Sequence, residues 1–264
     1  MTIFESLVLV LTAAVVFAAL RAMVPFSEPD TKFWANSVMF KRAQDRSDSI
    51  DPEAFDPGAM IMMESQTSPQ GVGMMKRALD IVLSLSLLVL TAPMLVLTAL
   101  AVKLESKGPA IYRQIRVGEN NRQFEILKFR SMVNDAERNG PQYAGVNDAR
   151  VTRVGAFIRK YRIDEIPQAV NVLRGEMSFV GPRPERPEFV EELRLALPNY
   201  EHRHTVRPGI TGWAQVKYEY AATLEGSRKK LRYDLYYILN QSILLDLLIL
   251  LLTVRVAMFG LGSR

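Results

Sequence analysis

IVLSLSLLVLTAPMLVLTALAV, residues Ile81 to Val102, decides the fold, because these 22 residues carry no charge. A helix rises about 1.5 Å per residue, so the run is long enough to cross a bilayer core of about 30 Å. A simple crossing should leave one flank poor in cations, whereas both flanks here are rich in them. These flanking cations are Lys76, Arg77, Lys103, Lys107, Arg113 and Arg116.

Pro93 lies near the middle of this run, where it removes one backbone hydrogen bond and bends a helix. A helix bent at Pro93 can enter and leave by the same membrane face, which removes the conflict between the two basic flanks. A kinked helix that spans the bilayer fits the hydropathy equally well. The residues alone leave both geometries open.

A second apolar stretch precedes this one, and we expect residues 1–24 to form an N-terminal membrane helix. A helix lying on the membrane surface is the alternative. Cations follow this stretch and none precedes it, so the rest of the chain is expected in the cytoplasm. Residues 25–75 are rich in Pro, Ser, Asp and Gln without an apolar period, which predicts a flexible acidic linker.

Composition limits the possible functions of the 264-residue chain. It has no cysteine, which excludes a disulfide framework and a thiolate metal site. Residues 1–75 carry 5 basic and 9 acidic side chains, which leaves 28 basic and 19 acidic ones for residues 76–264. This cationic larger part suits an anionic ligand, a phosphorylated substrate or an acidic membrane surface. No basic helix with interleaved aromatic residues is present, so no nucleic-acid partner is expected.

Short α and β elements are predicted beyond residue 108. Residues 110–118 and 122–132 flank Glu-Asn-Asn and predict a β-hairpin. Residues 164–175 predict a short helix closed by a glycine, and residues 243–259 an interfacial or core helix. On the second strand one face leads from an apolar base to two cations, along Phe124, Ile126, Lys128 and Arg130.

The adjacent carboxylates Asp164 and Glu165 follow a cluster of cations. In one interpretation they cap a helix, where acids suit the positive end of the dipole and Pro167 is tolerated. In the other they belong to a phosphate site, where nearby cations lower a carboxylate pKa. An ionised carboxylate there can act as a nucleophile or as a Mg²⁺ ligand. Both interpretations remain open.

Two downstream motifs fit a phosphate site. Pro182, Arg183 and Pro184 form a stiff backbone that would present the arginine with little entropy to lose, although polyproline linkers share this composition. Arg207 precedes a Pro-Gly turn and Trp213, a pattern that equally fits a turn against a buried tryptophan.

Taken together, these stretches resemble the bacterial sugar transferase family, the monotopic phosphoglycosyl transferases or polyprenyl-phosphate hexose-1-phosphate transferases of exopolysaccharide type. The resemblance runs in order from Lys76 to the C-terminus. It rests on KRALDIVLSL, KFRSM, NDARVTRVGAFIRKYRIDEIPQAVNVLRGEMSFVGPRPERPEF, RPGITGWAQV and LRYDLYYI.

The resemblance implies a mixed α/β, helix-rich monotopic membrane enzyme. It would contain a re-entrant helix over residues 81–102, interfacial amphipathic helices and a small β-hairpin or sheet element. The catalytic domain, residues 76–264, would lie on the cytoplasmic face of the bacterial inner membrane. The residues implied at the mouth and break of the re-entrant helix are Lys76, Arg77, Asp80 and Pro93.

The implied reaction moves sugar-1-phosphate from a UDP-sugar to undecaprenyl phosphate, giving undecaprenyl-diphospho-sugar and UMP. Asp164 would form a covalent phosphosugar-aspartyl intermediate, and Glu165 would assist through proton handling and Mg²⁺. Both carboxylates would be ligands of the metal. The implied or candidate substrate-binding residues are Lys128, Arg130, Pro182, Arg183, Pro184 and Arg207.

Such an enzyme would begin the assembly of an exopolysaccharide or another glycoconjugate. Its partners would be the two substrates, the lipid bilayer, a possible second copy of the chain and other polysaccharide assembly proteins. Similarity to exopolysaccharide-type members favours glucose or galactose as the sugar. The alternative is a catalytically silent, membrane-anchored scaffold of such an assembly complex.

Overall fold

The structure is a computed structural model that describes residues 48–53, 55, 69–138, 140, 145, 148–218 and 223–259. The predicted N-terminal membrane helix and most of the predicted linker lie outside these residues. The described residues from Ser49 onward belong to one unit.

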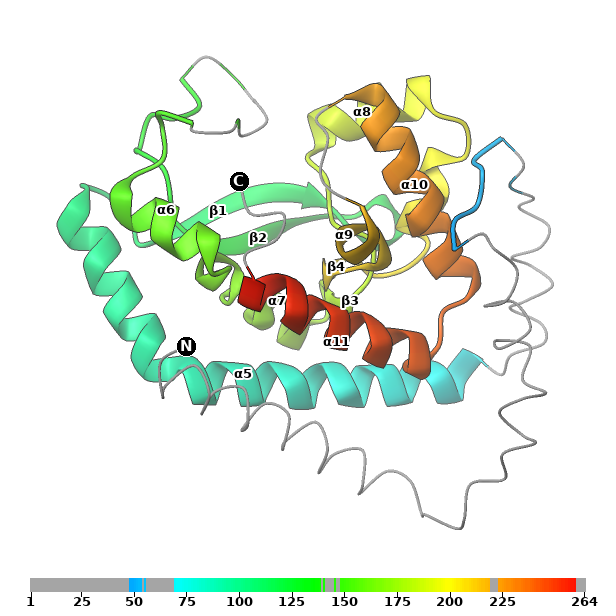
Figure 1. Cartoon of the computed structure of the whole chain (residues 1–264), viewed down its shortest axis with the longest axis horizontal. Coiled ribbons are helices and arrows are strands. Elements are labelled where there is room, and N and C mark those ends of the chain that lie inside the picture. Colours follow the sequence, from blue (N-terminus) through cyan, green and yellow to red (C-terminus); the bar gives the residue numbers. More distant parts are fainter. Residues whose placement is uncertain are drawn as a thin grey trace, which may run out of the picture. The chain divides into compact units, whose positions relative to one another are not determined.

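The longest element is α5, Pro69–Glu105, which contains Pro93. Figure 1 shows its axis changing direction sharply in its C-terminal part, which agrees with the predicted bend. Within the described part of the chain, Gly73–Glu105 is the one helix long and apolar enough to cross a bilayer by length and composition. Only 11% of its most apolar window is buried, so α5 is not a core helix.

A β-hairpin follows α5, as predicted. Strand β1, Ile111–Val117, pairs antiparallel with β2, Gln123–Phe129, and Tyr112 lies opposite Lys128. A second small sheet joins β3, Ser178–Val180, in parallel to β4, Gly209–Thr211. Gly209 is required there, because a Cβ on it would lie 2.1 Å from the backbone nitrogen of Gly181.

Short helices surround the two sheets (Figure 1). The predicted stop at Gly175 is confirmed, since this residue ends α7 with a φ of 83°. The remaining bounds are α6 Arg153–Lys160, α7 Gln168–Arg174, α8 Pro187–Ala196, α9 Trp213–Lys217, α10 Leu224–Leu239 and α11 Ile243–Phe259, with 3₁₀ turns at Glu119–Asn121, Ile163–Glu165 and Tyr200–His204.

Some residues of the predicted linker, 25–75, are helical or packed on the body in the part of the chain that the structure describes. Residues 69–75 already belong to α5. Upstream, Phe55 is buried in the apolar cluster beneath α8 and α10, and Ile50 packs against the same cluster. The backbone N–H of Ile50 also donates to the carbonyl of Arg232 in α10, beside which this segment lies (Figure 1). The burial of these two apolar side chains favours docking of this otherwise polar stretch.

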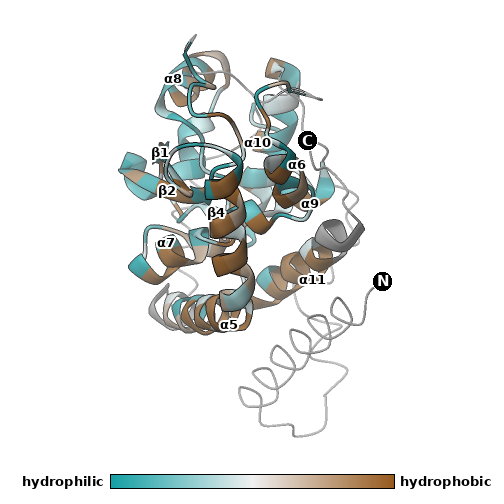
Figure 2. Ribbon diagram, turned by 90° about the vertical axis from the view of Figure 1, so that its left-hand side faces the viewer, coloured by the Kyte–Doolittle hydropathy of each residue, from teal (hydrophilic) through white to brown (hydrophobic). Residues whose placement is uncertain are grey.

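Helices α5 and α11 carry most of the exposed apolar surface. Figure 2 shows both largely in the hydrophobic colour. Helix α5 exposes a set that includes Val89 and Leu97, and α11 exposes Leu244, Leu248 and Leu251 at helical spacing. A soluble protein rarely leaves so much contiguous apolar surface in water, so this surface marks a membrane or partner contact.

Candidate functional site

Asp164 and Glu165 lie in the 3₁₀ turn Ile163–Glu165, between α6 and α7, and both are buried. Arg162 precedes them with a φ of 58°, a left-handed conformation that lets the chain turn directly after α6. The predicted helix from residue 164 starts later, at Gln168, and its N-cap residue makes no side-chain cap. The capping interpretation of the two acids is therefore wrong.

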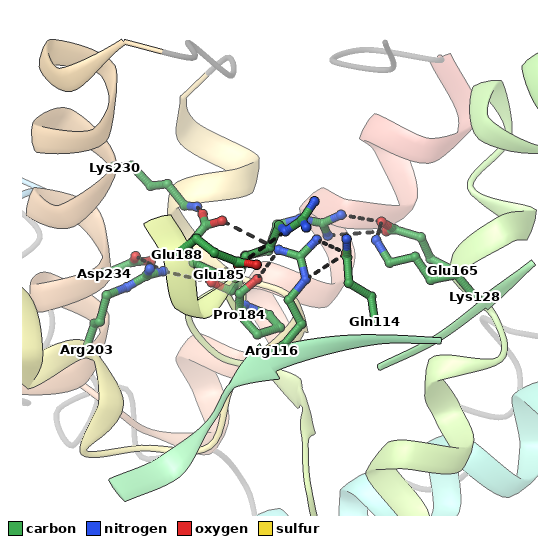
Figure 3. A network of polar contacts seen from close by, with 12 residues as sticks. Gln114, Arg116, Lys128, Glu165, Pro184, Glu185, Glu188, Arg203, Lys230 and Asp234 are labelled. Carbon is green, nitrogen blue, oxygen red and sulfur yellow. Dashed lines mark hydrogen bonds and ion pairs between the residues drawn. The ribbon is translucent and has the colours of Figure 1, made fainter. Parts of the chain in front are cut away.

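Glu165 is held by several cations (Figure 3). Its Oε1 accepts hydrogen bonds from Lys128 Nζ at 3.3 Å and from Arg183 Nη2. Its Oε2 has longer contacts, 3.4 Å from Arg183 Nη1 and 4.0 Å from Arg162. Asp164, in contrast, has a buried Oδ1 with no hydrogen-bond partner. One carboxylate is neutralised by fixed cations while its neighbour keeps an oxygen available.

These surroundings move the two acid pKa values in opposite directions. Burial disfavours the charged form of Glu165, but Arg183 and Lys128 outweigh it and hold the pKa of this carboxyl well below its usual range. Burial, together with the neighbouring charge of Glu165, raises the pKa of Asp164 to about 6. Nearby cations act to lower the pKa of both carboxyls, as expected, but at Asp164 burial and the charge of Glu165 outweigh them. Burial also lowers the pKa of Lys128, to about 8.

The Pro182-Arg183-Pro184 segment is fixed to the body, so the interpretation as a polyproline linker is wrong. All three carbonyl oxygens accept hydrogen bonds, and the Arg183 side chain reaches Glu165. The donors are the Gly209 backbone N–H at 2.9 Å to Pro182, Arg203 at 2.8 Å to Arg183 and Arg116 at 3.0 Å to Pro184.

Arg130 does not join the site. Its guanidinium donates to backbone carbonyls near the C-terminal end of α5, at 2.7 Å to Ser106 and 2.8 Å to Lys107. These two carbonyls belong to the residues that follow α5, so the buried arginine fixes the chain where it leaves the helix. The structure thus places Arg130 against the chain just beyond α5, and its binding of substrate stays a prediction.

Arg207, like Arg130, has its polar partner away from Asp164 and Glu165, which are called the dyad from here on. Its side chain pairs with Glu119 at 3.5 Å, in the turn that joins β1 to β2. Lys128 lies near the far end of β2 from that turn. The hairpin therefore brings Lys128 to Glu165 and holds Arg207 at its other end.

Three predicted residues of α5 attach this helix to the body. Lys76 donates to Asp246 of α11 at 2.6 Å and to the carbonyl of Val180 at 3.0 Å. Arg77 donates to the carbonyls of the last turn of α7, and Asp80 accepts from β3. The polar start of α5 is thus bound to α7, α11 and β3.

Sequence reasoning missed a buried ionic network behind the Arg183 segment (Figure 3). One signal was available for Arg116, because the period of two along β1 puts it on the face of Tyr112, which lies opposite Lys128. A second signal was Asp234, which lies in a helix between Leu231 and Leu235. A charged side chain among apolar residues of a helix indicates a buried charge that needs a partner. The members of this network are Arg116, Glu185, Arg203, Lys230 and Asp234.

Asp164 and Glu165 are the acidic residues of the site that could hold a metal ion. Among the described residues, no group of three or more acidic or histidine side chains converges on one point. Mg²⁺, however, is commonly bound by one or two carboxylates together with substrate phosphates and waters. The unpartnered Oδ1 of Asp164 and the loosely held Oε2 of Glu165 are oxygen donors of that kind.

Comparison with known proteins identifies the family of the chain. The family model described as bacterial sugar transferase matches residues 72–260. The chain is 50% identical over 189 residues to a UDP-N-acetylgalactosamine-undecaprenyl-phosphate N-acetylgalactosaminephosphotransferase of Aeromonas hydrophila, covering 72% of this chain and 45% of that protein. It is 45% identical to UDP-glucose:undecaprenyl-phosphate glucose-1-phosphate transferases of Escherichia coli (75% of this chain, 43% of that protein) and of Caulobacter vibrioides (69% of each).

The chain spans less than half the length of the first two relatives. The match of the family model nevertheless includes all but the first three residues of α5, both sheets and the Asp164–Glu165 dyad. The chain therefore belongs to the bacterial sugar transferase family.

Proposed function

We propose that the chain transfers sugar-1-phosphate from a UDP-sugar to undecaprenyl phosphate, with Asp164 as the nucleophile. The observation that carries this proposal is the contrast within the dyad. Asp164 keeps a buried, unpartnered Oδ1, whereas the charge of Glu165 is neutralised by Lys128 and Arg183. The names of the relatives, all of which are undecaprenyl-phosphate sugar phosphotransferases, support the same reaction class.

The proposed reaction has two displacements at one phosphorus atom. A carboxylate oxygen of Asp164 attacks the sugar-bearing phosphorus, the bond from this phosphorus to the bridging oxygen breaks, and UMP leaves. A phosphate oxygen of undecaprenyl phosphate then attacks the same phosphorus and releases the Asp164 carboxylate. The two half-reactions share one covalent intermediate, so ping-pong kinetics are expected.

The chain's own residues supply charge and position. Lys128 and Arg183 bring positive charge to the place where the diphosphate must lie if Asp164 is to attack it, and they hold Glu165 ionised. A carboxylate with a pKa near 6 is ionised at neutral pH while remaining more basic than an ordinary aspartate. Bound Mg²⁺, held by Asp164 and Glu165, would neutralise part of the diphosphate charge.

The enzyme is proposed to be monotopic and seated on the cytoplasmic face of the inner membrane. The exposed apolar faces of α5 and α11 support contact with a membrane. A bent α5 that re-enters the same face would leave the dyad at the bilayer surface. A lipid-linked phosphate and a water-soluble nucleotide sugar can meet in productive geometry at that level.

A UMP-release assay tests the proposal. Purified protein with Mg²⁺, undecaprenyl phosphate and either UDP-glucose, UDP-galactose or UDP-N-acetylgalactosamine should release UMP with at least one sugar. Asp164→Asn should abolish release while the protein still folds and binds membranes. Mass spectrometry after incubation with the active nucleotide sugar alone should find the phosphosugar on the peptide containing Asp164.

The scaffold alternative gives the opposite result in the same assay. No UMP with any UDP-sugar, from protein that folds and associates with membranes, would favour the scaffold. Full activity of Asp164→Asn would remove the assigned nucleophile but keep the transferase.

A further inference from the structure

Arg203 occupies a buried position behind the dyad. It lies in the 3₁₀ turn Tyr200–His204, and only 3% of its surface is exposed. Its Nη2 donates to the carbonyl of Arg183 at 2.8 Å and to Asp234 Oδ2 at 2.9 Å, while its Nη1 donates to Tyr200 Oη at 2.7 Å. Figure 3 shows Arg203 and Asp234 on the side of the network away from Glu165. One guanidinium therefore joins α10 to the main chain of Arg183.

Arg183 is the residue whose side chain holds Glu165. A contact at its carbonyl oxygen fixes the backbone from which that side chain extends. The continuous path runs from Asp234 through Arg203 and Arg183 to Glu165. Each link is a hydrogen bond to a charged group, the class of hydrogen bond that contributes most in a buried site.

We propose that Arg203 is a positioning residue of the transfer reaction: it holds the main chain at Arg183 so that Arg183 can orient Glu165 beside Asp164. This inference rests on the proposed function. Arg203 touches neither Asp164 nor Glu165 in the described contacts and acts through Arg183. The ion pair with Asp234 compensates the cost of burying the Arg203 guanidinium away from water.

The test compares single-turnover UMP release by the wild-type enzyme and by Arg203→Lys. Lysine keeps the charge, but its single ammonium cannot reproduce the fork that bonds Arg183, Asp234 and Tyr200 together. We expect the rate at saturating UDP-sugar to fall on the order of tenfold to a hundredfold, because small displacements of positioning groups cost this much. The KM for the UDP-sugar should change by less than about threefold, since the loss falls on the transition state.

Asp234→Asn is the second variant, because it keeps the side-chain shape if Arg203→Lys does not fold. Its amide oxygen can still accept from Arg203, so the rate should fall in the same direction but by less. Leu193→Ala is the matched control: Leu193 of α8 is buried in the same apolar cluster as Tyr200, and its side chain has no polar atom that could bond Arg203 or Arg183. It should lower the Tm while its rate per folded molecule stays at the wild-type value.

A double variant separates positioning from a general loss of structure. If Arg203 acts through Arg183 and Glu165, adding Arg203→Lys to Glu165→Gln should slow the reaction little beyond Glu165→Gln alone. Multiplied effects, or a single variant that behaves like Leu193→Ala, would overturn the positioning role. Failure of the wild-type enzyme to release UMP would instead overturn the proposed function.

Discussion

Asp164 and Glu165 are neighbours in the chain, yet their carboxylates lie in opposite electrostatic surroundings. Glu165 is paired with Lys128 at 3.3 Å and with both nitrogens of the Arg183 fork, while Oδ1 of Asp164 is buried without a partner. Consecutive residues in a tight turn point in different directions, so a single step along the chain is enough to separate an ion-paired acid from an isolated one. This asymmetry has measurable consequences for stability and for rate.

The two acids should affect stability with opposite pH dependence. The folded pKa of Asp164 is raised above its ordinary value of 3.8 to about 6, so the stability it supports at low pH is lost as the pH rises through about 6. At pH 7.5 Asp164→Asn should therefore be more stable than the wild type by on the order of 1–3 kcal/mol, a gap that shrinks towards pH 4. Thermal denaturation across this range measures it.

Glu165→Gln is the matched control for that experiment. The folded pKa of Glu165 is lowered, so its contribution to stability is present above its ordinary value of 4.5 and is lost as the pH falls through the depressed folded pKa. This variant should be less stable than the wild type at pH 7.5, and the gap should narrow in acid. If Asp164→Asn and Glu165→Gln changed the stability at pH 7.5 in the same direction, the opposite pKa shifts of the two acids would be contradicted.

The rate of UMP release should follow a bell-shaped pH profile. The acid limb, near pH 6, reports ionisation of Asp164, and the alkaline limb, near pH 8, reports loss of the proton that lets Lys128 hold Glu165. Lys128→Arg keeps a cation at this position whose charge persists far above pH 8, so it should retain the acid limb and lose the alkaline one. An unchanged alkaline limb in that variant would assign it to another group.

Phe55 should contribute substantially to the stability of the body, although it precedes the region matched by the family model. It is 5% exposed, and its ring packs on His202 with a centroid distance of 5.1 Å. Phe55→Ala should cost about 3–5 kcal/mol in the free energy of unfolding. Glu53→Ala removes an exposed ion pair with Arg228 and should cost less than about 1 kcal/mol. Chemical denaturation measures the free energy of unfolding of both variants. Similar losses for Phe55→Ala and Glu53→Ala would contradict the packing of Phe55 in the core.

The path of α5 through the membrane can be tested by cysteine labelling, because the chain has no native cysteine. Met74 and Leu104, near the two ends of the helix, are 73% and 86% exposed. In a re-entrant helix, Met74→Cys and Leu104→Cys should react with an impermeant maleimide from the same side of sealed vesicles. Labelling from opposite sides would establish a spanning helix.

Local patterns in the sequence were sufficient for several features. The charge-free run and Pro93 predicted the long bent α5, the alternation around Glu-Asn-Asn predicted the hairpin, and Gly175 predicted the end of α7. Each of these depends on neighbouring residues, through backbone geometry and the periodicity of apolar side chains. The ordered motifs also identified the Asp164–Glu165 pair as a candidate site.

Charge pairing required the tertiary structure. Lys128 and Arg130 share a strand face in the sequence pattern, yet the first reaches Glu165 and the second reaches the end of α5. Arg203 and Asp234 are far apart in the chain and meet only because a 3₁₀ turn packs against α10. By itself the sequence determined the elements and the residue types available for phosphate chemistry. Only the tertiary structure decided which charges are paired and how their pKa values move, because burial and long-range contacts set the local dielectric and the nearest partner of each ionised group.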